Sequence, residues 1–208
     1  MLGDIKYEVP REVVADRIMN VTVSKVSLPT PESLDYVGTD GMISYTGLIN
    51  YLTTNSERNK EIASALNENA DHYNLILSDR VEHLKQLMAL VKDQSLCCMV
   101  DGSMVSKKAK AERQNAIQDM REGKKHYLFA TYSLAKEGLD IPILDRLYMT
   151  TPHKDMAVIV QSVGRIARTH TGKGEPICYD FVDSEIPFCE KAFKSRKTHY
   201  KKIDCKII

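Results

Sequence analysis

The sequence lacks the features that would place it in several specialised classes of protein. Its 29 basic and 28 acidic side chains nearly cancel, so the chain as a whole has no pull toward polyanions. The longest apolar runs have the length of a strand, which is too short for a transmembrane helix. The N-terminus lacks the basic segment and apolar stretch of a signal peptide. There is no internal repeat and no low-complexity tract. A chain of 208 residues is long enough for one good-sized domain with an extension. We expect this protein to be soluble and cytoplasmic.

The five cysteines also lack a pattern that would give them a special role. Their number is odd and none has the CxxC spacing of a zinc site or a redox pair. We interpret them as reduced thiols and expect no metal site. Cys97, Cys98 and Cys178 fall within apolar runs, where cysteine usually serves as a small buried hydrophobe.

Apolar runs alternate with helix-like segments through most of the chain. Runs of strand length lie near 73–77, 96–100, 126–130, 145–149 and 176–182, and the segment around residues 21–28 suggests another strand. Such alternation is typical of an α/β fold, a mostly parallel sheet flanked by helices. Ligands of such sheets bind at the carboxyl ends of the strands, where Ser78, Gly102, Thr131 and Thr150 or Thr151 would gather.

The segment from Met156 to Arg168 has the pattern of an amphipathic helix. On a helical wheel of about 100° per residue, Gln161, Arg165 and Arg168 share one narrow arc. The opposite face collects the apolar side chains, with Val158 alone out of place; these are Met156, Ile159, Val160, Val163, Ile166 and Ala167. By itself, a glutamine and two arginines on one face indicate only a solvated surface.

A second sequence pattern precedes this helix, and the two patterns together indicate a function. Thr131 closes an apolar run, and the turn after it reads Thr-x6-Gly-x-Asp, ending at Gly138 and Asp140. The turn resembles motif V of superfamily 2 helicases, and Gln-x-x-Gly-Arg-x-x-Arg at 161–168 resembles their motif VI. The resemblance covers about residues 73–183. It implies a RecA-like fold and the second motor domain of a nucleic-acid-dependent ATPase.

The resemblance also implies roles for individual residues. Arginine stays charged and directs several donors toward phosphate oxygens, which suits a group that stabilises phosphoryl transfer. Arg165 and Arg168 would act as arginine fingers on ATP held by another domain, and Gln161 would couple that site to the nucleic acid. Asp140 would bond the ribose of the nucleotide, and Gly138 would keep the turn close to it.

Three further positions would contribute to a nucleic-acid track, together with Thr131 on the phosphate backbone. Ser78 and Arg80 follow the strand at 73–77, in a segment that resembles motif IV. Gly102 lies in the turn after the strand at 96–100, where a missing side chain would let a phosphate approach. The alternative for Ser78 or Asp79 is a plain helix cap, for Arg80 a surface arginine, and for Gly102 an ordinary strand-exit turn.

We divide the chain into three parts. Residues 1–54 resemble an interdomain linker or insertion, residues 55–186 form the second RecA-like domain, and residues 187–208 form a basic C-terminal helix or tail. Basic and aromatic side chains alternate in that tail, which could bind a phosphate backbone or could belong to a solvated helix. They are Lys191, Phe193, Lys194, Arg196, Lys197, His199, Tyr200, Lys201, Lys202 and Lys206.

The phosphate-binding machinery of a complete motor is missing. No Gly-x4-Gly-Lys-Ser/Thr loop occurs, and no Asp-Glu pair of the magnesium-holding type. We expect the cofactors to be ATP with Mg²⁺, the ion being held mainly by a first RecA-like motor domain. That domain would lie in the same longer chain or in a separate subunit. The chain alone should not hydrolyse ATP.

The details of the motifs indicate the substrate. Motif VI opens with Gln161-Ser162, where DEAD-box RNA helicases usually have His-Arg. This favours the DNA-directed, type III restriction-like branch, with RNA as the alternative. A non-enzymatic module that binds nucleic acid or a partner protein is a further alternative. A dinucleotide-binding domain is disfavoured because no Gly-x-Gly-x-x-Gly occurs, and no membrane partner is expected.

Overall fold

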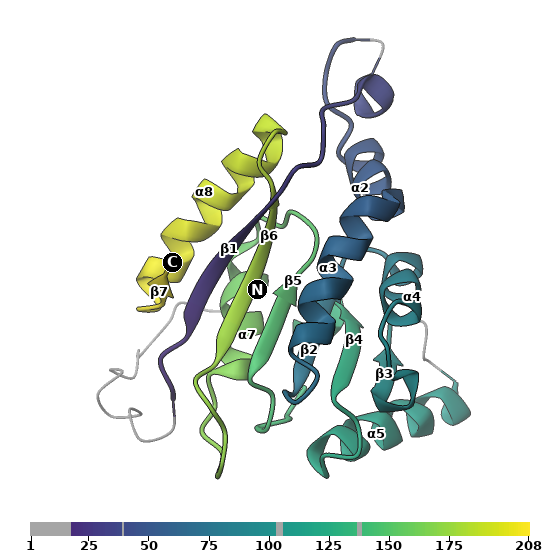
Figure 1. The fold of residues 1–208 in the computed structure, drawn as a ribbon, viewed down its shortest axis with the longest axis vertical. Coiled ribbons are helices and arrows are strands. Elements are labelled where there is room, and N and C mark those ends of the chain that lie inside the picture. Colours follow the sequence, from purple (N-terminus) through teal and green to yellow (C-terminus); the bar gives the residue numbers. More distant parts are fainter. Residues whose placement is uncertain (1–17, 39, 103–105, 137–138) are drawn as a thin grey trace, which may run out of the picture.

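The computed structural model of the chain describes residues 18–38, 40–102, 106–136 and 139–208, which form one sheet with helices packed on it (Figure 1). The sheet has seven strands in the order β3-β4-β2-β5-β6-β1-β7, and every pairing is parallel. The strands are β1 Thr22–Leu28, β2 Asn74–Ser78, β3 Cys97–Val100, β4 Tyr127–Thr131, β5 Arg146–Met149, β6 Ile177–Asp183 and β7 Lys206–Ile207. The predicted α/β fold with a parallel sheet is confirmed.

Helices cover both faces of this sheet. α3 and α4 pack on one face, and α5 to α8 pack on the other (Figure 1). The short helix η2 and α2 pack with the start of α8 beyond the carboxyl ends of the strands. The helices are η2 Leu34–Tyr36, α2 Tyr45–Thr54, α3 Ser56–Glu68, α4 Val81–Ala89, η3 Gln94–Leu96, α5 Lys107–Arg121, α6 Tyr132–Lys136, α7 Met156–Ile166 and α8 Pro187–Lys202.

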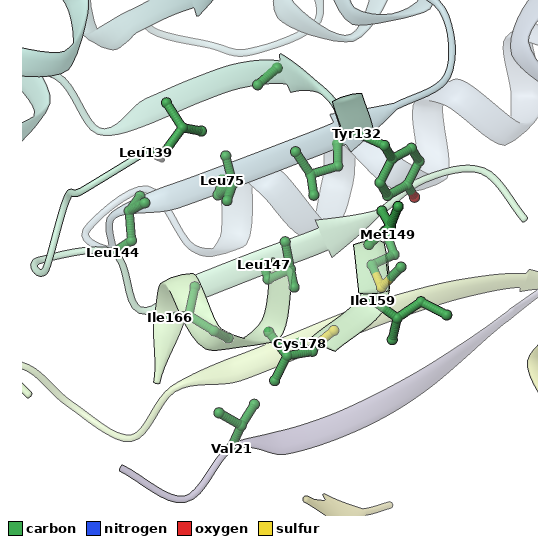
Figure 2. Close-up of a cluster of buried hydrophobic side chains, with 14 of the residues drawn as sticks. Val21, Leu75, Tyr132, Leu139, Leu144, Leu147, Met149, Ile159, Ile166 and Cys178 are labelled. Atoms are coloured by element: carbon green, nitrogen blue, oxygen red, sulfur yellow. The ribbon is translucent and has the colours of Figure 1, made fainter. Parts of the chain in front are cut away.

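The central strands are buried on both faces, which explains why they appear as continuous apolar runs. In β2, Leu75 and Leu77 face the side of α7, whereas Ile76 faces α3 and α4. Figure 2 shows the first of these clusters, in which Leu75, Leu147 and Cys178 of neighbouring strands gather with Ile159 and Ile166 of α7. β1 to β6 begin within one residue of the predicted runs, and β7 was not predicted.

Side chains cap the starts of α3 and α5, whereas the predicted cap of α4 is wrong. Asn55 caps α3 by accepting the amide of Arg58, and Ser106 caps α5 by accepting the amide of Ala109. For α4 we expected Ser78 or Asp79 as the cap, but the cap position is Arg80 and no side chain bonds there. Both predicted caps are engaged elsewhere, as the site shows.

The segments at both ends of the chain contribute to the sheet. β1 pairs with β6 along its whole length, and β7 pairs with the start of β1. The boundaries at residues 54 and 187 stay predictions. In α8, Phe193, Arg196 and Tyr200 are buried, so these three side chains cannot reach a phosphate backbone. Within the described residues, no helix is long and apolar enough to cross a membrane.

Candidate functional site at the carboxyl edge

The carboxyl ends of the strands bring the predicted contact residues together. Ser78 and Thr131 are register partners at the ends of β2 and β4. Gly102 follows β3, whose last residue pairs with Ala130, and Thr150 follows β5. This is the arrangement expected of parallel strands, because their carboxyl ends share one edge of the sheet.

A cavity of about 350 Å³ opens at this edge. Thr131 borders it, and its hydroxyl oxygen lies 3.0 Å from that of Ser133. Two carboxylates border it as well, but one of them, Asp155, caps α7 by accepting the amides of Ala157 and Val158. The lining residues are Ser78, Asp79, Thr131, Tyr132, Ser133, His153, Asp155 and Val158.

Asp79, predicted from the sequence only as a possible helix cap, bonds to several residues at this edge. Its carboxylate accepts the Thr151 hydroxyl at 2.9 Å and the Tyr45 hydroxyl at 3.4 Å, and it lies 3.7 Å from Nδ1 of His153. Burial raises the pKa of Tyr45 to about 12, and the charge of Asp79 adds to the effect. These partners are far apart in sequence, so no local pattern could have indicated them.

His153 is held in the same edge by an aromatic contact. The ring of Tyr132 stacks on it with centroids 4.7 Å apart and planes 9° from parallel. The Tyr132 hydroxyl donates to the carbonyl of Thr151 at 3.1 Å, which fixes the first turn of α6 to the end of β5. The edge is therefore a preorganised polar surface.

Ser78 is buried and bonded inward. Its oxygen lies 2.9 Å from Nδ1 of His83 and accepts the amide of Arg80, while Nε2 of His83 lies 3.0 Å from the amide oxygen of Asn59. Burial lowers the pKa of His83 to about 3, and the charge of Arg58 acts in the same direction. The ring is neutral, and Ser78 shapes the turn that presents the half-exposed Arg80. Contact of either residue with nucleic acid stays a prediction.

The polar arc of α7 lies on its outer side. Gln161 is exposed and Arg165 is partly exposed, while burial lowers the pKa of Arg165. The prediction was wrong at two positions of α7: Val158, placed outside the apolar face, is buried in the core, and Met156, placed on that face, is half-exposed. The buried face is wider than one arc because α6 and α8 flank the helix in addition to the sheet beneath it.

Two of the predicted ATP-facing residues contact each other. Asp140 sits between Leu139 and Ile141, whose side chains are buried in the core, so the turn presents its carboxylate outward. This carboxylate forms an ion pair with Arg168, and both side chains are largely exposed, at 58% and 41%. The other predicted nucleotide contact, Gly138, lies outside the described residues.

A comparison with known protein families shows which family has this arrangement. The model of the helicase conserved C-terminal domain matches residues 57–170, which is more than half of the chain. The chain belongs to this helicase family. It is the C-terminal domain of a superfamily 2 helicase, and the predicted RecA-like fold is confirmed by the solved structures that it resembles.

Relatives of this helicase domain are known from viruses and eukaryotes. The ATP-dependent DNA helicase UvsW of Enterobacteria phage T4 is 26% identical over 144 residues, 68% of this chain and 28% of that protein. The crystal structure of T4 UvsW superposes with a TM-score of 0.68 at 19% identity, covering 90% of this chain and 40% of that one. S. cerevisiae Dbp5 bound to RNA and ADP BeF3 gives a TM-score of 0.58 at 14% identity, covering 91% and 41%. The chain spans about a quarter of the length of the curated relatives that it matches.

Helicases of this family use ATP with Mg²⁺, and the site can be tested against both. Exposed arginine beside an exposed carboxylate suits a nucleotide, since phosphate attracts the guanidinium and a ribose hydroxyl can donate to Asp140. In the part of the chain that the structure describes, no three His, Cys, Asp or Glu side chains gather as metal ligands would. Among the described residues, Arg168 and Asp140 therefore have the chemistry that a nucleotide requires, and no group of three metal ligands is found for the ion.

Proposed function

We propose that this helicase domain is the second motor domain of an ATP-dependent DNA helicase or translocase. It supplies arginine fingers to ATP bound by a first motor domain, and it forms part of the nucleic-acid track. The observation that supports this most is the Arg168–Asp140 ion pair, which places the ends of the motif V and motif VI segments in contact. Arg165 and Gln161 lie on the helix that leads to Arg168.

The exposed ion pair suggests how the fingers work. An ion pair in solvent is worth only about 0–1 kcal/mol, so little energy is needed to separate Arg168 from Asp140. When ATP arrives on the first domain, the guanidinium can turn to the phosphate and the carboxylate can accept a ribose hydroxyl. Arg165 stabilises the charge that develops as the phosphoryl group transfers. Mg²⁺ would neutralise the phosphates from ligands on the first domain.

The nucleic-acid track would follow the carboxyl edge of the sheet. Gly102 is exposed, and among the described residues, its own atoms and chain neighbours aside, no atom lies within 4 Å of the place a Cβ would take, so a phosphate can approach its backbone. Thr131, Arg80 and the turn shaped by Ser78 are the other contacts in this proposal. Contacts with phosphates carry no sequence information, so the enzyme should show little base preference.

The choice of DNA rests on Gln161-Ser162 at the start of motif VI and on the name of the T4 relative. RNA is the second candidate, because the Dbp5 structure bound to RNA has the same fold. DNA and RNA can be distinguished as substrates by testing which of the two nucleic acids stimulates ATP turnover. A non-enzymatic binding module would show no stimulated turnover with either strand in a complete protein.

The test is Arg165→Ala in the complete two-domain protein. We expect ATP turnover stimulated by single-stranded DNA to fall by about 10³-fold or more, since an arginine finger contributes this much to phosphoryl transfer. DNA binding, measured by fluorescence anisotropy, should change by less than about threefold, a change of under 1 kcal/mol. The 208-residue chain alone serves as the baseline and should show no turnover.

A matched control is Lys110→Ala, an exposed cation on α5 far from motif VI in sequence. It should leave both quantities unchanged. An equal loss of turnover and DNA binding in Arg165→Ala would contradict the finger assignment, and turnover by the chain alone would contradict the division between two domains.

A further inference from the structure

A lysine between α7 and β6 makes an unusual set of contacts. Lys173 follows Gly172, which has a φ of +78°, and its side chain turns back into the protein. The ammonium donates to three backbone carbonyls, those of Pro142 at 3.0 Å, Ile166 at 2.7 Å and Arg168 at 2.7 Å. A lysine ammonium has three N–H donors, so all of them are engaged.

The three carbonyls belong to the two segments that carry the predicted ATP-facing residues. Ile166 is the last residue of α7, and Arg168 lies two residues beyond it. Carbonyls at the end of a helix have no partner within the helix and carry partial negative charge, which an ammonium satisfies. Pro142 lies two residues after Asp140. Lys173 therefore joins the end of motif VI to the end of motif V.

This link differs in kind from the ion pair between the same segments. The Arg168–Asp140 pair is exposed, and in the proposed mechanism the nucleotide breaks it. Within the part of the chain that the structure describes, the hydrogen bonds of the Lys173 ammonium go to three backbone oxygens, which engage all three of its donors. Its contacts can persist after the pair has separated.

We propose that Lys173 is a positioning residue of the ATP site. It holds the turn of Asp140 and the end of α7 at a fixed separation, so that Arg168 stays aligned with the phosphate when it leaves Asp140. The relevance to ATP rests on the proposed function, whereas the positioning of the two segments does not.

The surroundings of Lys173 predict a dependence on pH. Burial lowers its pKa to about 8 and the charge of Arg168 acts in the same direction, while Asp145 at the start of β5 opposes both. The other titratable groups around the adjoining cavity are Asp71, His72, Tyr73 and His170. Deprotonation leaves two donors for three carbonyls. The link is therefore complete below about pH 8 and incomplete above it.

The first experiment measures the positioning in the 208-residue chain without any nucleotide. Lys173→Met keeps most of the side-chain length and removes every donor, while Lys173→Arg keeps donors and a charge that does not titrate in this range. Amide hydrogen exchange at one pH should speed up at least tenfold at residues 139–141 and 166–168 in Lys173→Met. It should stay within about threefold of wild type in Lys173→Arg and in the exposed control Lys197→Met. Unchanged exchange in Lys173→Met would overturn the inference.

The second experiment measures ATP turnover in the complete two-domain protein. Lys173→Met should lower kcat at least tenfold at pH 7 with KM for ATP changed less than threefold, because the residue does not touch the nucleotide. In wild type, kcat should fall as the pH rises through about 8, and Lys173→Arg should move this fall to higher pH. A kcat and pH profile unchanged in Lys173→Met would overturn the role at the ATP site. If the arginine variant does not fold, loss of the fall near pH 8 in Lys173→Met decides the same question.

The experiments can reject the arginine finger at Arg165 and the positioning role of Lys173 independently of each other. Faster exchange in Lys173→Met together with full turnover in Arg165→Ala would support the positioning of the two segments and reject the proposed finger. Unchanged exchange with a strong loss of turnover in Arg165→Ala would reject the role of Lys173 and keep the finger.

Discussion

Two arginine–aspartate pairs of this domain have the same chemistry in opposite surroundings. Arg196 of α8 contacts Asp180 of β6 through Nε at 2.8 Å and Nη2 at 2.7 Å, and the side chains are 1% and 0% exposed. Arg168 and Asp140 also form an ion pair, but at 41% and 58% exposure. The first pair joins a helix to the sheet, and the second joins two surface segments.

The difference shows what each arginine can do. Burial alone would lower the pKa of Arg196, but the charge and hydrogen bonds of Asp180 raise it above the ordinary value, so the guanidinium stays charged. It also donates to the carbonyl of His153, and Tyr200 donates to Asp180. A buried pair with all these partners cannot exchange one of them for phosphate, whereas the exposed pair can.

We expect the largest loss of stability when the buried Arg196–Asp180 pair is broken. Arg196→Ala leaves the carboxylate of Asp180 buried without its counter-charge, which should cost about 3–5 kcal/mol of unfolding free energy. Urea unfolding followed by circular dichroism measures this. The exposed neighbour Lys197→Ala should stay within about 0.5 kcal/mol of wild type. A loss below about 1 kcal/mol in Arg196→Ala would remove the contrast between the two pairs.

A buried group without a counter-charge should respond to pH. The pKa of His83 is about 3 in the folded chain and about 6.5 in the unfolded one, so the unfolded chain binds the extra proton between these values. Stability is therefore complete above about pH 6.5 and falls as the pH drops toward 3, by on the order of 5 kcal/mol in total. Unfolding free energies between pH 7 and 4 measure this fall. His83→Gln should fall less steeply over that range, and equal slopes would refute the assignment.

The smallest stability effect is expected at the exposed pair. Arg168→Ala should change the unfolding free energy by less than about 1 kcal/mol, because solvent screens the pair. The same urea titration measures it. A cost above about 2 kcal/mol would mean that Arg168 holds the fold together, and it would then be a poor candidate for a residue that moves to phosphate.

The sequence predicted what depends on short-range patterns. The central strands β2, β4 and β5 were found because they are apolar runs buried on both faces of the sheet. The polar arc of α7 was found because three residues recur at helical spacing. These signals lie within a few residues of one another.

What the sequence did not predict depends on partners far along the chain. Asp79 meets Thr151 just after the carboxyl ends of β2 and β5, and Lys173 meets Pro142 ahead of the amino ends of β6 and β5, because parallel strands bring these distant segments together. Arg196 was grouped with the basic residues of the tail because its charge is visible in the sequence and its partner Asp180 is not. Spacing cannot tell a buried cation from an exposed one when α8 packs on the sheet.

The position of β1 in the sheet affects how this domain folds and where its chain can be truncated. Its neighbours in the sheet are β6 and β7, so Thr22 lies beside Ile177 and Lys206. Synthesis must deliver almost the entire domain before β1 can be enclosed, and this long-range closure should slow folding. A truncated chain that began at residue 55 would lack β1. The backbone N–H and C=O groups of β6 on that side would then be unpaired, and β7 would have no neighbouring strand. Such an unpaired edge invites association between copies, so an expression boundary is better placed ahead of β1.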